Sequence, residues 1–143
     1  MYRTRKTTIK YNPSKARQNF YKQDAECPFC DLKNNKVIKE FKHFNIIENL
    51  YRYEYWDYLR VTEHLMVVPK RHIDLMSDLN EKEKVELIDV LAAYEEKGFN
   101  IYARESKSIV KSIPHQHTHL LRTQGEPTKF FVYLRRPYLL IRY

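Results

Sequence analysis

Short runs of aromatic and β-branched residues alternate with polar turns along the chain, and one longer segment has helical spacing. The runs predict β-strands, because such side chains suit the pleated surface of a sheet. They cover residues 43–50, 51–60, 64–69, 99–103, 115–121, 130–134 and 138–142. Residues 81–97 predict a helix, with one face formed by Val85, Ile88, Leu91 and Ala92.

The predicted helix has sequence signals at both ends. Asn80 can act as the N-cap, and Glu83 stands at the N3 position of a capping box. Gly98 suits the C′ position, where the backbone turns left-handed. With the strands, this predicts an α+β domain that has a mainly antiparallel sheet and one main helix.

Composition fits one soluble globular domain. The chain has 143 residues, of which 43% are hydrophobic and 31% charged. With two glycines in all, it has no GxGxxG or Walker phosphate cradle. No apolar run approaches the roughly 18 residues of a membrane span, so no membrane partner is expected. The basic N-terminus lacks the apolar core of a signal peptide, which predicts a cytoplasmic protein.

The net charge of +8 is concentrated at the two ends. Residues 1–22 hold seven basic side chains and residues 129–143 hold four, without an acid in either segment. We therefore expect a basic N-terminal arm over 1–22 and a domain over 23–143 that includes basic C-terminal strands. Such ends favour polyanions, nucleic acid among them, although a solubilising tail has the same composition.

The segment SIPHQHTHLL, residues 112–121, places His115, His117 and His119 at alternate positions. In a strand, all three imidazoles would lie on one face of the sheet. This arrangement suits metal ligation, phosphate binding or nucleophilic catalysis. The pattern alone does not distinguish a catalytic site from a simple metal site.

A second segment, HLMVVPKRH at residues 64–72, precedes the predicted helix. With the His-x-His-x-His run, it resembles the histidine triad (HIT) superfamily over about residues 27–121. The resemblance implies a nucleotide hydrolase or nucleotidyltransferase that acts at an α-phosphate, of the phosphoramidase or dinucleoside polyphosphate hydrolase class. It also implies a homodimer, because members of this superfamily are often dimers.

The resemblance assigns a role to each matching residue. His117 is the nucleophile that becomes a nucleotidyl-histidine, and His119 binds phosphate and assists the leaving group. His64 completes the cluster, and Ser112 donates to the phosphate. Because the uridylyltransferase branch has glutamine at the third triad position, His119 favours hydrolysis over transfer.

The chain departs from the family pattern before the triad. The family's asparagine and glycine-rich loop are replaced by residues without glycine: Arg104, Ser106, Ile109, Val110 and Lys111. We expect Lys111 or Arg104 to supply charge in place of backbone amides. Asp57, with Glu54 as the alternative, is expected to bind the ribose. An enzyme acting on nucleic-acid ends through the basic termini, and a non-catalytic binding module, stay as alternatives.

Cys27 and Cys30 form a Cys-Pro-Phe-Cys pair, whose spacing lets both thiolates reach one tetrahedral metal ion. A redox role would favour a βαβ context that the surrounding pattern lacks. The resemblance to zinc-bearing branches, and to the related galactose-1-phosphate uridylyltransferases, implies that His72 and His115 complete the set. Four protein ligands predict a structural zinc ion.

Overall fold

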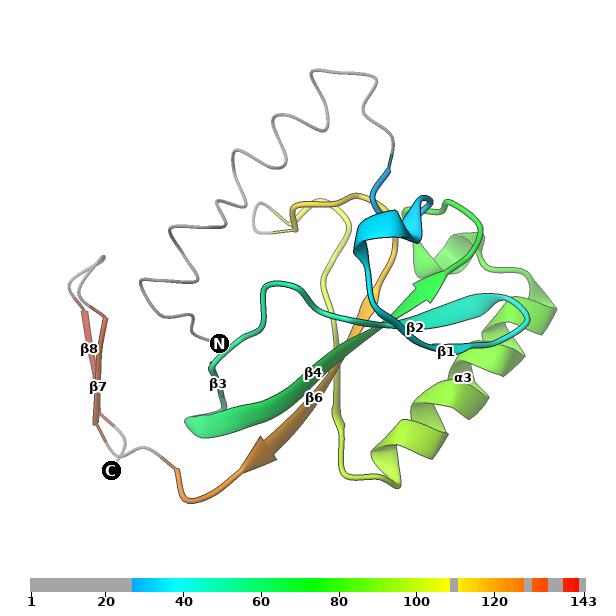
Figure 1. The fold of residues 1–143 in the computed structure, drawn as a ribbon. Helices are drawn as coiled ribbons and strands as arrows, with labels where there is room; N and C mark the ends of the chain where they lie inside the picture. Colours follow the sequence, from blue (N-terminus) through cyan, green and yellow to red (C-terminus); the bar gives the residue numbers. More distant parts are fainter. Residues whose placement is uncertain (1–26, 109–110, 128–129, 134–137, 142–143) are drawn as a thin grey trace.

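The computed structural model describes residues 27–108, 111–127, 130–133 and 138–141 (Figure 1). Its single α-helix among these residues is α3, Glu81–Glu95, and two short 3₁₀ turns are η1, Leu32–Asn34, and η2, Met76–Asp78. The strands are β1 Val37–Glu40, β2 Phe44–Glu48, β3 Tyr55–Trp56, β4 Leu59–Pro69, β5 Asn100–Ala103, β6 Thr118–Gln124, β7 Phe130–Tyr133 and β8 Tyr138–Ile141.

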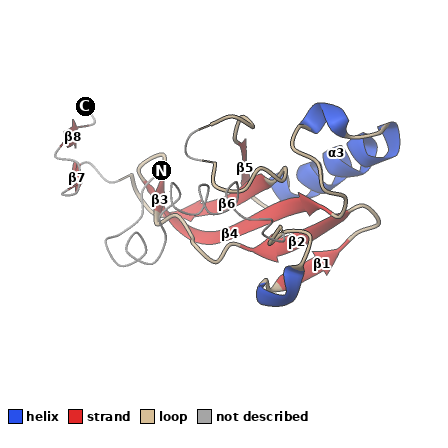
Figure 2. Ribbon diagram, turned by 90° about the horizontal axis from the view of Figure 1, so that it is seen from above, coloured by secondary structure: helices blue, strands red, loops and turns tan. Residues whose placement is uncertain are grey.

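The main sheet has the order β1-β2-β4-β6-β5, and β3 pairs with the start of β4. Every described pair is antiparallel. The β7–β8 hairpin forms a separate two-stranded sheet, which lies away from the main sheet in both ribbon views (Figure 2). This architecture confirms the α+β class with one main helix.

The alternation of side chains along β4 divides the interior into two clusters. Leu65 and Val67 face helix α3, where they join a core that includes Leu87, Val90 and Tyr94. The intervening residues Met66 and Val68 face the other side, where they pack with Cys27, Phe29 and Ile47. His64 precedes this alternation on the side of Met66, so the histidine chemistry lies on the face opposite the helix.

Helix α3 confirms the predicted start signals but not the predicted buried face. Asn80 and Glu83 form the reciprocal capping box, and Gly98 has the left-handed φ of 80°. The buried positions are Glu83, Leu87, Val90 and Tyr94. Val85 and Ile88 are instead 61% and 63% exposed, and Leu91 lies at the margin of the core. The buried apolar side chains Leu87, Val90 and Tyr94 have helical spacing of their own, and Glu83, one turn before Leu87, pairs with Arg71.

The single strand predicted over 51–60 is wrong. Residues 49–54 form a loop, and β3 and β4 then form a tight hairpin whose turn is Asp57 and Tyr58. Both turn residues have positive φ, 48° and 63°. Two residues with positive φ match the type I′ turn that the right-handed twist of paired strands prefers. The chain therefore reverses direction at Asp57, within a segment whose composition otherwise resembles a single strand.

Strand β6 begins at Thr118 rather than at residue 115. His119 is thus the one triad histidine within a strand, while His115 and His117 lie in the preceding segment. The backbone N–H of Gln116 donates to the carbonyl of Ile73, 2.6 Å away, which holds this segment against the loop that follows β4. The expected basic arm over 1–22 lies outside the described residues. No described helix is long and apolar enough to span a membrane.

Candidate active site and metal centre

Three histidines from distant parts of the chain meet on the face of the sheet opposite α3. His64 lies on β4, His119 on β6, and His117 immediately before β6. The ring centroid of His119 lies 5.1 Å from that of His64 and 5.0 Å from that of His117. All three side chains are buried, with exposed fractions of 1%, 7% and 4% for His64, His117 and His119. The structure therefore brings together the three residues that the sequence predicted to be catalytic.

Hydrogen bonds define where the protons lie on two of these rings. The backbone N–H of Tyr53 donates to His64 Nδ1 at 3.1 Å, so a neutral His64 carries its proton on Nε2. His64 Nε2 lies 2.9 Å from His119 Nδ1, which is then the acceptor, while the nearby Asn49 amide donates to Met66 Sδ at 3.5 Å. A neutral His119 consequently carries its own proton on Nε2, which makes that nitrogen a hydrogen-bond donor.

His117 has the opposite arrangement. Its Nδ1 lies 2.8 Å from the backbone carbonyl oxygen of His115, an acceptor that requires the proton on Nδ1. The lone pair is then on Nε2. Burial lowers the pKa of the His117 imidazole to about 4, with further contributions from Lys111 and Arg104, so the ring is neutral at pH 7. A neutral imidazole with its lone pair on Nε2 is a competent nucleophile.

An aromatic wall that the sequence did not predict encloses His64 and His119. The Tyr53 ring lies 4.5 Å from His64 and 5.6 Å from His119, and it stacks on Trp56 at 6.4 Å. Tyr102, opposite His119 in the β5–β6 register, stacks on it at 5.8 Å. Arg104 donates to the Tyr53 hydroxyl at 3.3 Å. The wall excludes water from one side of the cluster.

Lys111 and Ser112 approach the triad from the loop before it. Lys111 is 3% exposed, and its Nζ donates to Gln116 Oε1 at 3.3 Å. Burial lowers the pKa of this ammonium, while Asp74 and Glu105 act in the opposite direction. By its bond to Gln116, Lys111 is held to the residue that directly precedes His117 in the chain. Ser112 follows it and is partly exposed.

The structure does not bring Asp57 together with the histidines. Asp57 is exposed at the tip of the β3–β4 hairpin. At about 3.3 Å per residue, the strand between this turn and His64 separates the two by roughly 15 Å. Glu54, the alternative, is partly buried in the 49–54 loop. Asn49, which follows β2, is the polar residue beside the cluster, with Nδ2 3.0 Å from His64 Nε2.

Cys27, Cys30, His72 and His115 form a second cluster, in which all ligand atoms lie within 4.8 Å of one another. Separate pairs measure 3.4 Å for Cys27 Sγ to His115 Nδ1 and 3.2 Å for Cys30 Sγ to His72 Nδ1. Sulfur and nitrogen ligands of a tetrahedral zinc ion are separated by about 3.5 Å. These four side chains therefore fit a metal ion without rearrangement.

The surroundings of the cluster also suit a metal. The Nε2 of His115 lies 2.9 Å from the Pro69 carbonyl, and the Nε2 of His72 lies 3.5 Å from an Asp74 carboxylate oxygen. Each ring thus directs Nδ1 toward the cysteines while an oxygen holds its other nitrogen, as metal-ligating histidines commonly do. Burial and the neighbouring Cys27 raise the pKa of the Cys30 thiol to about 11. A bound cation would stabilise the thiolate form of Cys30 and so offset the effects that raise its pKa.

Phe29 connects the two clusters. It belongs to the turn between the cysteines, and its ring makes edge contacts with His115 at 5.9 Å and with His117 at 5.2 Å. Cys27 closes that turn by accepting from the backbone N–H groups of Cys30 and Asp31. The position of the cysteine turn therefore affects the orientation of the His117 ring through Phe29.

Comparison with known proteins agrees with this geometry. Residues 60–126 match the family model of the HIT domain, a range that includes His64, His72 and the three histidines of the triad. A search of curated proteins gave no match. Solved structures with the same fold include a HIT family hydrolase from Clostridium thermocellum, with 21% identity and a TM-score of 0.54. The comparison covers 73% of this chain and 96% of that one.

Two further structures have similar folds. A zinc-bound histidine triad family protein from Mycobacterium smegmatis is 20% identical, with a TM-score of 0.53 and coverage of 70% of this chain and 76% of that one. A hypothetical histidine triad nucleotide-binding protein from Sulfolobus tokodaii is 22% identical, with a TM-score of 0.53 and coverage of 78% of each chain. At these identities the likeness concerns the fold. Together with the HIT domain matched over residues 60–126 and the assembled histidine cluster, it supports membership of this chain in the histidine triad superfamily.

Proposed function

We propose that this protein is a nucleotide hydrolase or nucleotidyltransferase in which His117 attacks the α-phosphate of a nucleotide. The observation that carries the proposal is the contact of His117 Nδ1 with the His115 carbonyl, which leaves the lone pair on Nε2. The adjacent His119 supports it, because the hydrogen-bond chain from Tyr53 through His64 leaves a proton on His119 Nε2. The site thus offers a nucleophile beside a hydrogen-bond donor that can stabilise the leaving group.

The reaction proceeds in two displacements. First, His117 Nε2 forms a bond to the α-phosphorus, while the bond from phosphorus to the leaving atom breaks with its electron pair on that atom. The N–H at His119 Nε2 donates a hydrogen bond to that atom and stabilises its developing negative charge, and the leaving group takes its proton from solvent. A water oxygen then attacks the phosphorus, the N–P bond breaks with its electron pair returning to His117 Nε2, and one proton of that water is released to solvent. The product is a nucleoside monophosphate.

Charge on the non-bridging phosphate oxygens is stabilised by side chains in place of glycine-loop amides. The Lys111 ammonium is the principal group, because it is buried and hydrogen-bonded to Gln116, which directly precedes His117. Ser112 adds a hydroxyl donor, and Arg104 adds a guanidinium anchored on Tyr53. In a site that excludes water, such preorganised donors contribute strongly to transition-state stabilisation.

We also propose that Cys27, Cys30, His72 and His115 hold a structural zinc ion. Four protein ligands leave no open coordination position for a substrate, and the fit of the ligand distances supports the assignment. When bound, the ion would supply a rigid crosslink rather than chemistry at the phosphate. Through Phe29, the crosslink orients the ring of the nucleophile.

The test compares the wild type with His117→Ala on three substrates: a nucleoside phosphoramidate, a dinucleoside polyphosphate and an adenylated oligonucleotide. We expect the wild type to release nucleoside monophosphate from at least one of them. The variant should lose at least about 10³-fold of that rate, since a nucleophile has no substitute in a two-step displacement. Mass spectrometry after an alkaline quench should find the nucleotidyl group on the peptide that contains His117.

His43→Gln is the matched control, because His43 is paired with Glu86 and lies outside the cluster. It should retain wild-type turnover. Circular dichroism and zinc content of His117→Ala should match the wild type, so that a lost rate is not lost folding. Full turnover by His117→Ala, or no turnover of any substrate by the folded wild type, would contradict the proposal and favour a binding module.

A further inference from the structure

The turn between Cys27 and Cys30 holds the two sulfur atoms close to each other as well as to the histidines. The Cys27 carbonyl accepts from the backbone N–H groups of Cys30 at 2.9 Å and of Asp31 at 3.1 Å. In such a turn the first and fourth α-carbons lie within about 7 Å, and a disulfide spans roughly 4.4–6.8 Å between α-carbons. The two sulfur atoms lie within 4.8 Å of each other. The pair can therefore close a disulfide by side-chain rotation while the turn is kept.

The two thiols differ in their access to solvent. Cys27 is 9% exposed and packs with Ile47, Met66 and Val68, whereas Cys30 is exposed. An oxidant from solution therefore reaches the sulfur of Cys30 first. Cysteines that are oxidised reversibly commonly combine an accessible sulfur with a second thiol that resolves the first product. Cys27 can act as this second thiol, because it is within reach of Cys30 and shielded from the oxidant itself.

Oxidation of this pair would also undo the metal centre. The chain has two cysteines in all, and both belong to the candidate zinc set. A disulfide would withdraw both sulfur ligands together, and of the four side chains only His72 and His115 would be left. Two imidazoles do not retain a zinc ion as a closed set of four ligands does. Disulfide formation and metal loss are therefore one coupled event.

We infer that Cys27 and Cys30 form a reversible oxidation site, at which hydrogen peroxide converts the zinc-binding pair into a disulfide. The Cys30 sulfur attacks one peroxide oxygen, the O–O bond breaks, and the other oxygen takes a proton from solvent and leaves as water. The Cys27 sulfur then attacks the Cys30 sulfur, and the S–O bond breaks with its electron pair on oxygen, which leaves as a second water. In balance, two thiolates, one peroxide and two protons give one disulfide and two waters. Two electrons pass from sulfur to the peroxide oxygens.

Two contacts connect this oxidation site to the nucleophile, and this part of the inference rests on the proposed function. The ring of Phe29, within the turn, lies 5.2 Å from the ring of His117. His115 Nδ1 lies 3.4 Å from Cys27 Sγ and 3.6 Å from Cys30 Sγ, and the His115 carbonyl accepts from His117 Nδ1 at 2.8 Å. A disulfide draws the two sulfur atoms to about 2 Å from each other and releases His115 from them. Both groups that orient the His117 ring thus lose a support.

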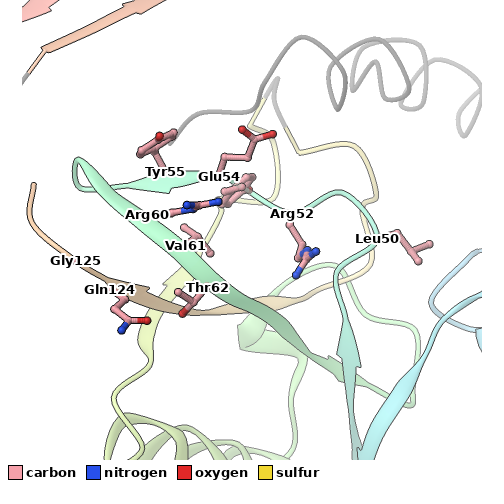
Figure 3. A pocket seen from close by; sticks show the side chains of 10 residues that line it. Leu50, Arg52, Glu54, Tyr55, Arg60, Val61, Thr62, Gln124 and Gly125 are labelled. Carbon is pink, nitrogen blue, oxygen red and sulfur yellow. The ribbon is translucent and has the colours of Figure 1, made fainter. Parts of the chain in front are cut away.

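An open pocket borders the histidine cluster through Tyr53. It is formed by residues 50 and 52–55 with the outer part of β4 (Figure 3), and the Tyr53 ring in its lining contacts His64 and His119. Neither cysteine lines this pocket, nor does Phe29. A substrate that reaches the cluster through the pocket would therefore meet the same surface before and after oxidation. Oxidation should lower kcat and leave KM nearly unchanged.

The experiment treats the reduced, zinc-loaded full chain with hydrogen peroxide. It follows the zinc released to a chromogenic chelator, the free thiols, and the mass of the peptide that contains both cysteines. We expect one zinc ion per chain to be released as both thiols disappear, and the peptide to lose the mass of two hydrogen atoms. kcat should fall about tenfold, with KM within about twofold of the reduced protein. A dithiol reductant with added zinc should reverse every change.

Two variants serve as controls. Cys30→His keeps four ligands for zinc but leaves a single sulfur, so its zinc should stay bound at a peroxide concentration that empties the wild type. Cys27→Ser keeps the exposed sulfur without the thiol that resolves it. The same peptide of this variant should gain oxygen atoms rather than lose two hydrogens.

The outcomes separate this inference from the proposed function. A wild type that keeps its zinc and both thiols in excess peroxide would overturn the inference, and so would zinc loss with both thiols still free. A disulfide that forms with zinc release and unchanged kcat would keep the oxidation site and refute its coupling to His117. If the wild type turns over no substrate, the proposed function fails and the coupling fails with it. The zinc, thiol and mass measurements need no substrate, so they decide the oxidation site in every case.

Discussion

Lys111 has an environment unlike that of an ordinary surface lysine. It is 3% exposed, its Nζ contacts the Gln116 amide oxygen, and burial lowers its pKa. Burying an ammonium against a neutral amide rather than a carboxylate costs stability, and the fold tolerates this cost beside the nucleophile. A phosphate at His117 would supply the missing negative charge. The lysine thereby becomes a group whose main interaction is with the substrate.

We predict that Lys111→Met lowers kcat/KM about a hundredfold and leaves the protein at least as stable as the wild type. The rate falls because an electrostatic donor near the phosphate is lost. Stability is retained because methionine fills a similar volume without a buried charge. Steady-state kinetics and urea unfolding measure the two effects. Lys107→Met, at an exposed position of the preceding loop, is the control; a Lys111→Met protein with wild-type kcat/KM would assign the lysine to folding alone.

Sequence patterns predicted only those site residues that lie within short motifs. The spacing of His117 and His119 and the segment beginning at His64 were enough to identify the cluster. Tyr53 and Tyr102 could not be identified in this way, because the loop path and the β5–β6 register bring them to the site, whereas Arg104 was expected from its place in the loop before the triad. Asp57 lies apart from the cluster for a related reason, since one hairpin turn carries it to the far end of β4.

At the scale of elements, the start of α3 is fixed by a small network. Glu83 accepts from the Asn80 backbone in the capping box and also receives two hydrogen bonds from Arg71, at 3.1 and 2.8 Å. The hydrogen bond from Arg71 holds the pKa of this carboxyl below its ordinary 4.5, and Asn80 and His43 add to the effect. This one carboxylate joins the helix to the segment between β4 and η2.

We predict that Glu83→Gln lowers the free energy of unfolding by about 1 kcal/mol at pH 7, because the amide keeps the cap but loses the charge. The folded pKa lies below the unfolded one, so the stabilisation is present above pH 4.5 and is lost as the pH falls through the folded value. Urea unfolding at pH 7 and pH 3.5 should therefore give a difference that shrinks in acid. Glu81→Gln, at an exposed position in the same turn, is the control; an equal loss at both pH values would exclude the charge as the cause.

Helix α3 also shows which structural features a local sequence pattern can predict. The sequence predicts a helix over residues 81–97, and α3 spans Glu81–Glu95. The agreement is close because the capping signals at the helix ends are local. The buried face was misjudged, because Val85 and Ile88 look like core residues in sequence and Glu83 does not. Its burial depends on Arg71, a partner twelve residues away. Leu87, Val90 and Tyr94 form a second apolar set at helical spacing, so periodicity offered two candidate faces, and packing against the sheet selected this one.

At the scale of the whole molecule, the metal cluster ties together three separate parts of the chain. Cys27 and Cys30 lie at the start of the described residues, His72 follows the central strand β4, and His115 precedes β6. Cys27 and His115 are 88 residues apart in sequence. A crosslink between segments so distant removes much conformational freedom from the unfolded chain. The turn that carries Phe29 is also packed against Ile47, Met66 and Val68, and we expect a bound ion to fix its position further.

We predict that Cys30→Ser reduces bound zinc from one ion per chain to less than about a tenth, and that it lowers the melting temperature by several degrees. Cys30 is the discriminating ligand, because it is exposed and its loss leaves no core cavity. Atomic absorption and thermal unfolding measure these effects directly. A dithiol chelator added to the wild type should reproduce both, and Asp31→Asn, one residue further along the chain, should reproduce neither.

The same variant tests whether the crosslink reaches the active site. Once zinc is lost, we expect core packing alone to hold Phe29 less firmly against the His117 ring, so kcat should fall further than the lost stability explains. Phe29→Leu separates the two effects, because it keeps the ligands and an apolar side chain but removes the edge contact. We expect this variant to bind one zinc ion per chain, to melt within a few degrees of the wild type, and to lose about tenfold in kcat. If Phe29→Leu turns over at the wild-type rate and Cys30→Ser does not, the ion supports the fold of the molecule without orienting its nucleophile.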